Sequence, residues 1–597
     1  MTPPERQAAT PRSAAGVWRI PWGFTLALVS LVALTFGLAR PEGWDDSFYV
    51  AQMTSLVGDG DLLLQDDLLA FPGQDDVLRL RAILFTTEDG GVANMFGIGP
   101  AILHSTYLWP SLRSSPEVGQ SFRIRIGLAS MALLAIVAVA TRTLLVRLGF
   151  GEGLATICSL GSIFWGPLAI YGTRLYLNSH LPSAVCASLV ALLCWDWVER
   201  GGAGRATLIG FCCGLAAVVR FQDALLGLAM APFLLLGLRR RADRRRALIE
   251  LALAAATFAL VVSVQVLAFD RQSGRIFGIP QGPDFMRWTQ PQLGRFLLSP
   301  YHGLVPWTPV FALGLLALPL TLGRADDPRK RLFLACLLAL VAAQCYVSAA
   351  TWDWAGGSSF SARRLSSVSM AAAVGLATLL SLVRRRVLAA GLIALASAWA
   401  LVAASLFVAN IDDLNLLLHG TPSNDNPLLI GYPPRGSLGP LDFVGFARGS
   451  FSLVDPNRPS LPHRAIGLGL CLLVCAGVVL AWRVASRYPR LPALIAASSV
   501  AWACFWWLAV WRAPSNAAAN RVWRQVATGT ASDQALTSLP PEIAAAGRVV
   551  LGWKALRRGQ IEDGRQLLSQ SQSPQFPPLN LVDLALLDEV RLGMPTP

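Results

Sequence analysis

The chain has 597 residues, of which 54% are hydrophobic and only 14% are charged, and its mean hydropathy is +0.50. A soluble domain usually carries about a quarter charged residues, so this composition excludes an ordinary soluble protein and indicates a polytopic membrane protein. The net charge of +14 resides in arginines grouped between apolar runs, a pattern that reports membrane orientation and gives no indication of a nucleic-acid partner.

The first apolar run covers residues 17–38 and follows a short basic segment, residues 1–16. The run is as long as a full membrane span, and no clear small-residue cleavage site follows it. We therefore expect residues 1–16 to be a cytoplasmic N-terminal segment and 17–38 to be a retained span rather than a cleaved signal peptide.

Later apolar runs of roughly 18 to 25 residues can also cross the hydrocarbon as helices, which gives about thirteen expected spans in all. The thirteen expected spans, the first included, cover residues 17–38, 122–146, 152–172, 181–199, 205–220, 222–238, 247–268, 303–323, 331–350, 365–383, 386–409, 464–483 and 491–511. The stretch 96–110 is apolar but short and contains Gly and Pro, so we expect it to form a helix in the membrane interface.

Every second connection between the expected spans is rich in arginine, most clearly in the run LRRRADRRR at residues 238–246. Short arginine-rich loops stay in the cytoplasm, so the N-terminus is expected inside and the C-terminus outside. The segments expected outside are residues 39–121, 173–180, 269–302, 351–364 and 410–463 and the tail 512–597.

Two aspartates, Asp45 and Asp46, directly follow the first expected span and have Trp44 and Tyr49 as neighbours. Desolvation and partner charges at a membrane edge can tune a carboxylate, so we favour a catalytic role for this pair over simple hydration of the loop. The later aspartates of the same loop are expected to keep it hydrated.

An aromatic and basic segment, TWDWAGGSSFSARRL at residues 351–365, opens the tenth expected span from outside. Arg363 and Arg364 are unexpected there by the positive-inside rule. They can snorkel to the interface, but a guanidinium is also the group best suited to a phosphate. Trp352 and Trp354 fit either an interfacial aromatic belt or stacking on a sugar ring.

The remaining candidates lie in two other outward segments. Tyr301 and His302 stand at the mouth of the eighth expected span. Arg174, Asn178 and His180 lie in the short second outer loop, where a structural role is the favoured interpretation.

Lone histidines such as His104 and His302 have no neighbouring carboxylates and do not indicate a metal site. The ten cysteines fall inside apolar segments, where a thiol behaves as a small hydrophobe. We therefore expect no metal ligand and no certain cofactor, while a divalent metal ion is left open.

Taken together, DDSFY at 45–49, RFLLSPYHGLVPWTPV at 295–310 and WDWAGGSSFSARRL at 352–365 resemble motifs of the GT-C superfamily of membrane glycosyltransferases. That superfamily includes the protein O-mannosyltransferases and the bacterial aminoarabinose transferases. The resemblance covers about residues 17–510. It implies an all-α, GT-C-like bundle with a layer of outer loops, in a bacterial-type cytoplasmic membrane crossed many times.

The resemblance also implies a reaction. Such enzymes transfer a sugar from a polyprenyl phosphate carrier to a glycan, lipid or protein acceptor outside the membrane, usually with inversion. By resemblance Asp45 is the general base and Asp46 positions the acceptor. Arg363 and Arg364 hold the donor phosphate, with help from His302, Tyr301 and Arg174, and the sugar and acceptor contacts fall to Tyr49, Trp352, Trp354, Asn178 and His180. Many relatives carry a second carboxylate where this chain has Asn178 and His180, so the acceptor or donor class stays open.

The domain organisation is then a catalytic membrane domain at 17–511 and an extracytoplasmic helical tail at 512–597. The tail sequence GRVVLGWKALRRGQIEDGRQLLSQ has helical periodicity and resembles half of a tetratricopeptide unit. Two rival functions are a transporter or flippase of lipid-linked sugars and a non-catalytic assembly partner. A coupled transporter commonly needs ionisable residues midway through the bilayer, and the middle of the expected spans is almost uncharged.

Overall fold

The computed structural model describes residues 44–64, 67, 96–114, 120–173, 177–274, 276, 285–299, 302–354, 356, 359–420, 461–488, 490–516, 518, 519, 522, 525, 526, 531–539, 541–557 and 559–570. The first expected span, residues 17–38, and most of the late outer segment lie outside the described residues.

The described residues are helical apart from turns and one isolated antiparallel β-bridge between Met286 and Thr351, which confirms the all-α class. Among them, eight helices are long and apolar enough to span a membrane, and four shorter helices are also apolar. Each of these falls on one of the expected spans from residue 122 onward, so the chain is a multi-pass helical membrane protein.

The elements of the first half are α2 (Trp44–Thr54), the π-helix η2 (Ser55–Asp59), α5 (Gly99–Ser114), α6 (Gln120–Arg147), α7 (Glu152–Phe164), α8 (Leu168–Tyr171), α9 (His180–Arg200), α10 (Ala203–Val219), η3 (Phe221–Ala224), α11 (Leu225–Arg240) and α12 (Arg244–Ser273). The later elements are α13 (Leu293–Leu298), α14 (Leu304–Trp307), α15 (Pro309–Leu316), α16 (Leu318–Gly323), α17 (Pro328–Ala350), η5 (Arg363–Val368), α18 (Ser369–Leu382), α19 (Arg386–Gly420), α21 (Leu461–Arg487), α22 (Leu491–Arg512), α24 (Asp533–Leu536), α25 (Pro541–Arg557) and α26 (Ile561–Gln570).

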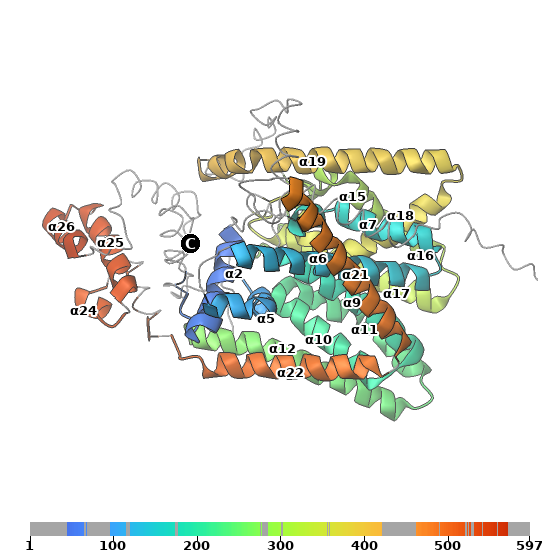
Figure 1. The fold of residues 1–597 in the computed structure, drawn as a ribbon, viewed down its shortest axis with the longest axis horizontal. Helices are drawn as coiled ribbons and strands as arrows, with labels where there is room; N and C mark the ends of the chain where they lie inside the picture. Colours follow the sequence, from blue (N-terminus) through green and yellow to red (C-terminus); the bar gives the residue numbers. More distant parts are fainter. Residues whose placement is uncertain are drawn as a thin grey trace, which may run out of the picture.

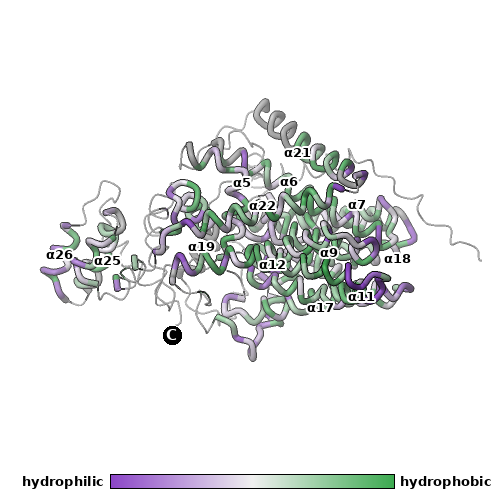
Figure 2. Tube along the Cα trace, turned by 90° about the horizontal axis from the view of Figure 1, so that it is seen from below, coloured by the Kyte–Doolittle hydropathy of each residue, from purple (hydrophilic) through white to green (hydrophobic). Residues whose placement is uncertain are grey.

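The long helices α6, α12, α19 and α22 run in nearly the same direction along the molecule, and α2 with α5 lies toward one end of them (Figure 1). The hairpin α25–α26, expected from the periodicity of the tail, extends beyond that end. Apolar residues line the body of the bundle, while hydrophilic residues gather toward the ends of its helices (Figure 2). This distribution is the one that a hydrocarbon layer imposes on spanning helices.

Small residues allow the spanning helices to approach closely. A Cβ atom added at Gly210 of α10 would lie 1.9 Å from the carbonyl oxygen of Ala254 in α12. A Cβ atom at Gly375 of α18 would lie 1.8 Å from the carbonyl oxygen of Gly314 in α15. Helices in a bilayer associate through such close packing, because lipid supplies no hydrophobic force between them.

Three expected boundaries differ from the structure. The expected span 152–172 is divided into α7 and α8, and the expected span 303–323 is divided into α14, α15 and α16. Prolines at 167, 306, 309 and 319 accompany these divisions, since proline cannot continue the hydrogen-bond ladder. Conversely, α19 continues to Gly420 instead of ending near 409, because no proline or glycine interrupts residues 392–419.

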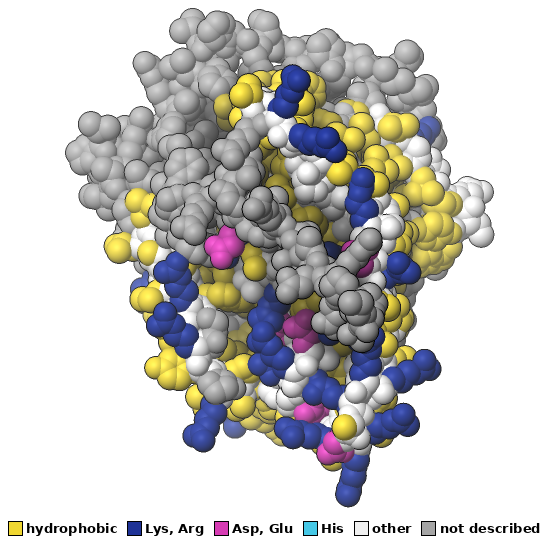
Figure 3. Space-filling view, turned by 90° about the vertical axis from the view of Figure 1, so that its right-hand side faces the viewer, with side chains coloured by type: hydrophobic (Ala, Val, Ile, Leu, Met, Phe, Trp, Pro, Cys, Tyr) yellow, Lys and Arg dark blue, Asp and Glu magenta, His cyan; other side chains and the backbone are white. Residues whose placement is uncertain are grey.

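The arginine-rich connections gather at one end of the bundle, which we call the basic end, and Figure 3 views the molecule from this side. Lys330 donates a 2.5 Å hydrogen bond to the carbonyl oxygen of Leu148, which joins the start of α17 to the end of α6. At the same end, Gly204 of α10 packs against Ala493 of α22. The basic connections of the sequence thus lie at one end of the helix bundle, and the non-basic connections that alternate with them lie at the other.

Candidate functional site

Among the described candidates, His180, His302, Arg363 and Arg364 lie close together at the end opposite the basic end, which we call the loop end. Here backbone hydrogen bonds connect the end of α17 and the residues that follow it to residues 285–292. The backbone nitrogen of Trp352 donates to the carbonyl oxygen of Phe285 at 2.7 Å, and the nitrogen of Arg287 donates to the oxygen of Ala350 at 2.6 Å. The two outward segments therefore form one layer.

Arg364 stabilises this layer from within. Its guanidinium donates to the hydroxyl of Thr351 at 2.6 Å and to the carboxylate of Asp353 at 3.3 Å, and it also contacts the carbonyl oxygen of Asp353. The side chain of Arg364 is only 13% exposed. Because these bonds connect η5 to the first residues after α17, Arg364 closes the intervening loop.

Arg363 has different surroundings. Its guanidinium carbon lies 6.0 Å from the centre of the Tyr171 ring, and a Cβ atom added at Gly356 would lie 3.1 Å from its Nε. Gly356 has a φ of +71° and its nitrogen donates to the Asp353 carboxylate at 2.8 Å. A glycine is needed here both for the left-handed backbone and for the close approach to Arg363.

Two buried histidines lie beside Arg363. The His180 ring is centred 4.6 Å from the Tyr171 ring, and a backbone group of Arg363 is within hydrogen-bonding reach of His180. Burial lowers the pKa of His302 to about 3, an effect that a backbone contact with Ser359 opposes and the charge of Arg363 reinforces. His302 is therefore a neutral imidazole at pH 7.

Backbone strain fixes the chain just before Arg363. Ser361 has a φ of +54°, which costs an L-residue about 1–2 kcal/mol. The hydroxyls of Ser361 and Thr308 lie 2.8 Å apart, and the nitrogen of Phe360 donates to the hydroxyl of Tyr171 at 2.9 Å. These contacts hold the strained turn and set the direction in which the chain enters η5.

A buried polar network beneath η5 was not predicted from the sequence. Asp223, only 1% exposed, accepts hydrogen bonds from the Ser183 hydroxyl and from Gln344 Nε2, the latter at 2.9 Å. Gln222 Nε2 donates to Gln344 Oε1 at 2.6 Å, and Gln222 and Arg220 each donate to the carbonyl oxygen of Arg364 at 3.2 Å. A signal did exist in the sequence, because Gln344 is a polar residue inside an otherwise apolar run.

The acidic pair lies on α2, and the side chains of Asp45 and Asp46 are outside the described residues, as are Tyr301 and Arg174. Their predicted roles stay predictions. Tyr49, in the same helix, is only 1% exposed.

The rest of α2 is connected to the site through an apolar cluster. Leu177, fully buried, belongs to the same cluster as Val50 and Met53 of α2 and Ile98, the residue before α5. Leu177 immediately precedes Asn178, which is 3% exposed. The helix that carries the acidic pair therefore shares an apolar cluster with the turn that precedes His180 and α9.

Some buried polar atoms at the loop end have no hydrogen-bond partner within the described part of the chain. They include His180 Nδ1 and Trp354 Nε1. Buried polar atoms are normally paired, so atoms such as these can receive a ligand. Trp352 is partly exposed, whereas Trp354 is 8% exposed. No group of three or more His, Cys, Asp or Glu side chains is close enough to hold a metal ion among the residues that the structure describes.

No protein-family model and no curated protein matches the chain. Among solved structures, it is similar to the oligosaccharyltransferase AglB of the archaeon Archaeoglobus fulgidus in complex with an inhibitory peptide and a dolichol-phosphate. The TM-score is 0.41 at 15% identity, over 66% of this chain and 56% of that chain. The apo form of an oligosaccharyltransferase of the same organism matches with a TM-score of 0.37 at 14% identity, over 66% of this chain and 55% of that one. The chain thus spans little more than half the length of these structures. The helices themselves show a polytopic helical membrane protein.

Proposed function

We propose that the chain is a GT-C-type glycosyltransferase that moves a sugar from a polyprenyl phosphate to an acceptor on the outer face of the membrane. The observation that carries the proposal is the position of Arg363. Its guanidinium lies at the loop end, close to two buried histidines and the Tyr171 ring. An arginine at this depth has no topological reason to be there.

Arg363 suits the donor phosphate. A guanidinium forms strong, paired hydrogen bonds with phosphate oxygens, and the partly buried setting strengthens them. The neutral His302 offers an N–H donor without adding a competing charge. We assign Arg364 to the closure of the loop, since its guanidinium already binds Thr351 and Asp353.

Asp45 is the proposed general base. The acceptor hydroxyl oxygen attacks the anomeric carbon while its proton passes to the Asp45 carboxylate. The bond between that carbon and the phosphate oxygen breaks, and the electron pair leaves with the polyprenyl phosphate. Arg363 stabilises the charge that builds on the phosphate. Asp46 is proposed to position the acceptor. Attack from the side opposite the phosphate inverts the anomeric centre.

A transfer assay tests the proposal. Purified full-length protein in lipid vesicles is supplied with a panel of radiolabelled polyprenyl phosphate sugars and with candidate glycan, lipid and peptide acceptors. The proposal expects one donor to be consumed by the wild type and not by Asp45→Asn. Asp59→Asn, in the same outer segment, is the matched control and should retain activity.

Two outcomes would contradict the proposal. Movement of labelled lipid between leaflets without consumption of any donor would support the flippase alternative. Equal turnover by the wild type and by Asp45→Asn would remove Asp45 from the mechanism.

A further inference from the structure

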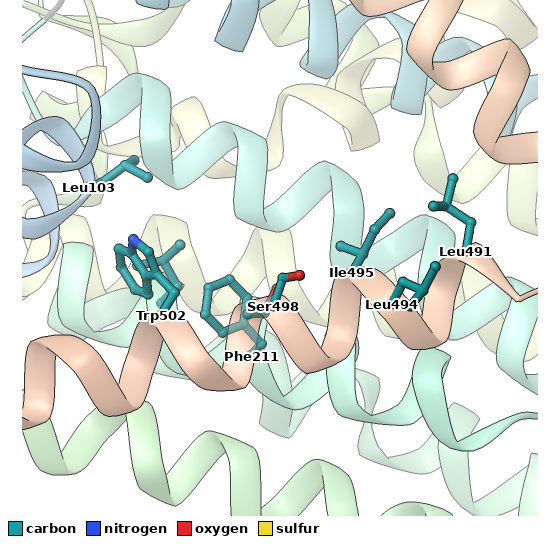
Figure 4. A pocket seen from close by; sticks show the side chains of 9 residues that line it. Leu103, Phe211, Leu491, Leu494, Ile495, Ser498 and Trp502 are labelled. Carbon is teal, nitrogen blue, oxygen red and sulfur yellow. The ribbon is translucent and has the colours of Figure 1, made fainter.

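An apolar groove runs between α10 and α22, and none of the residues that line it belongs to the loop-end site. It has a volume of about 440 Å³, and Leu103 of α5 is among the side chains that line it (Figure 4). The side chains that shape it include Leu103, Phe211, Leu491, Ile495, Ser498 and Trp502. Only serines interrupt the apolar lining, so the groove suits a hydrocarbon chain.

The groove has a definite position along the helix. It begins at Leu491, the first residue of α22, and ends at Trp502, whose ring lies 5.6 Å from that of Phe211. Eleven residues of α-helix rise about 16 Å. That length is close to half of the roughly 30 Å hydrocarbon core, which is the depth of a single leaflet.

The end of the groove at Leu491 lies at the basic end. Arg490 caps α22 immediately before Leu491, and Arg487 is the last residue of α21; both side chains are exposed. Gly204 packs against Ala493, which places this end of α22 beside the start of α10. A cationic mouth therefore precedes an apolar channel of one-leaflet depth.

We propose that this groove binds one anionic phospholipid of the leaflet at the basic end. One acyl chain lies along α22 as far as Trp502, and the headgroup phosphate contacts Arg487 and Arg490. Leu494 and Ile495, which are 64% and 44% exposed, present the groove to the surrounding lipid, so a chain can enter sideways. The proposal is independent of the glycosyltransferase assignment, because the groove begins at the end opposite Arg363.

The test measures lipid retention by native mass spectrometry. Purified full-length protein in detergent is titrated with phosphatidylglycerol or with phosphatidylcholine of the same acyl chains. We expect one phosphatidylglycerol to be retained in preference to phosphatidylcholine. The double variant Arg487→Gln with Arg490→Gln should lose that preference, roughly tenfold in affinity. Arg385→Gln, another exposed arginine of the described residues, is the matched control and should change nothing.

Two variants that fill the groove test the acyl chain. Ser498→Phe should reduce retention of the lipid roughly tenfold, because the phenylalanine ring would occupy the space of the acyl chain. Ile495→Trp, which alters a partly exposed side chain, provides the same test if Ser498→Phe fails to fold. Equal retention of both lipids by the wild type, or unchanged retention in the folded filling variants, would overturn the proposal. A dimer that Ser498→Phe converts to a monomer without loss of lipid would do the same, since a second copy would then occupy the groove.

Discussion

Replacing Gly356 with alanine tests whether Arg363 is held in a functional position. Gly356 has a φ of +71°, a conformation that costs an L-residue about 1–2 kcal/mol. The new Cβ atom would lie 3.1 Å from Arg363 Nε and 3.7 Å from its Cζ. Ordinary carbon contacts lie at about 3.5–4.0 Å, so the guanidinium must move by a few tenths of an ångström.

The expected consequence is weaker binding of the donor phosphate. A hydrogen bond to a charged group contributes about 1.5–3 kcal/mol, and its loss corresponds to roughly 10–150-fold in affinity. The assay is equilibrium binding of the polyprenyl phosphate sugar to purified Gly356→Ala. Gly391→Ala is the matched control, because an added Cβ there meets nothing within 4 Å.

The reasoning would be refuted by a folded Gly356→Ala variant with the donor affinity of the wild type. Lower thermal stability with unchanged donor affinity would also refute it. The alanine would then strain the backbone as expected, but the displacement of Arg363 would have no effect on donor binding. Gly391→Ala should bind the donor as the wild type does.

Three further predictions concern the groups around Arg363. Arg364→Lys should lower the free energy of unfolding by about 1–3 kcal/mol, since lysine cannot reproduce the forked contacts to Asp353. The same variant should change the donor KM little. Thermal unfolding measures the first effect and initial rates measure the second. Gln344→Ala should destabilise the protein by about 1–3 kcal/mol, because the buried Asp223 carboxylate loses its 2.9 Å donor, as thermal unfolding would report. Burial lowers the pKa of His302 to about 3 from 6.5, so the unfolded chain binds more protons between these values, and stability should fall as pH falls through that window. The His302 contribution to this loss is at most about 1.4 kcal/mol per pH unit, and thermal unfolding of His302→Gln should show a smaller loss than the wild type.

The spans were predictable because hydrocarbon imposes a strong and local requirement. Residues 491–511 were expected as a span and form α22, Leu491–Arg512. The alternation of arginine-rich connections likewise predicted that these connections share one end of the bundle. Both features depend on composition over windows of about twenty residues, which a single sequence reports well.

The organisation of the site was less predictable because it depends on long-range contacts. Arg363 and Arg364 are identical in type and adjacent, yet one closes the loop and the other lies over Tyr171. The same holds for the buried Asp223, which lies at the start of the expected span 222–238 and was not among the candidate site residues. Its partner Gln344 is 121 residues away, and no local pattern connects the two.

The most direct test of the central claim separates donor binding from the transfer step in two variants. Equilibrium binding and single-turnover transfer are measured with the donor that the wild type consumes. Asp45→Asn should bind the donor as the wild type does and fail to transfer the sugar, whereas Arg363→Ala should bind the donor at least about tenfold more weakly. Normal transfer by Asp45→Asn, or unchanged donor affinity in a folded Arg363→Ala, would contradict the account.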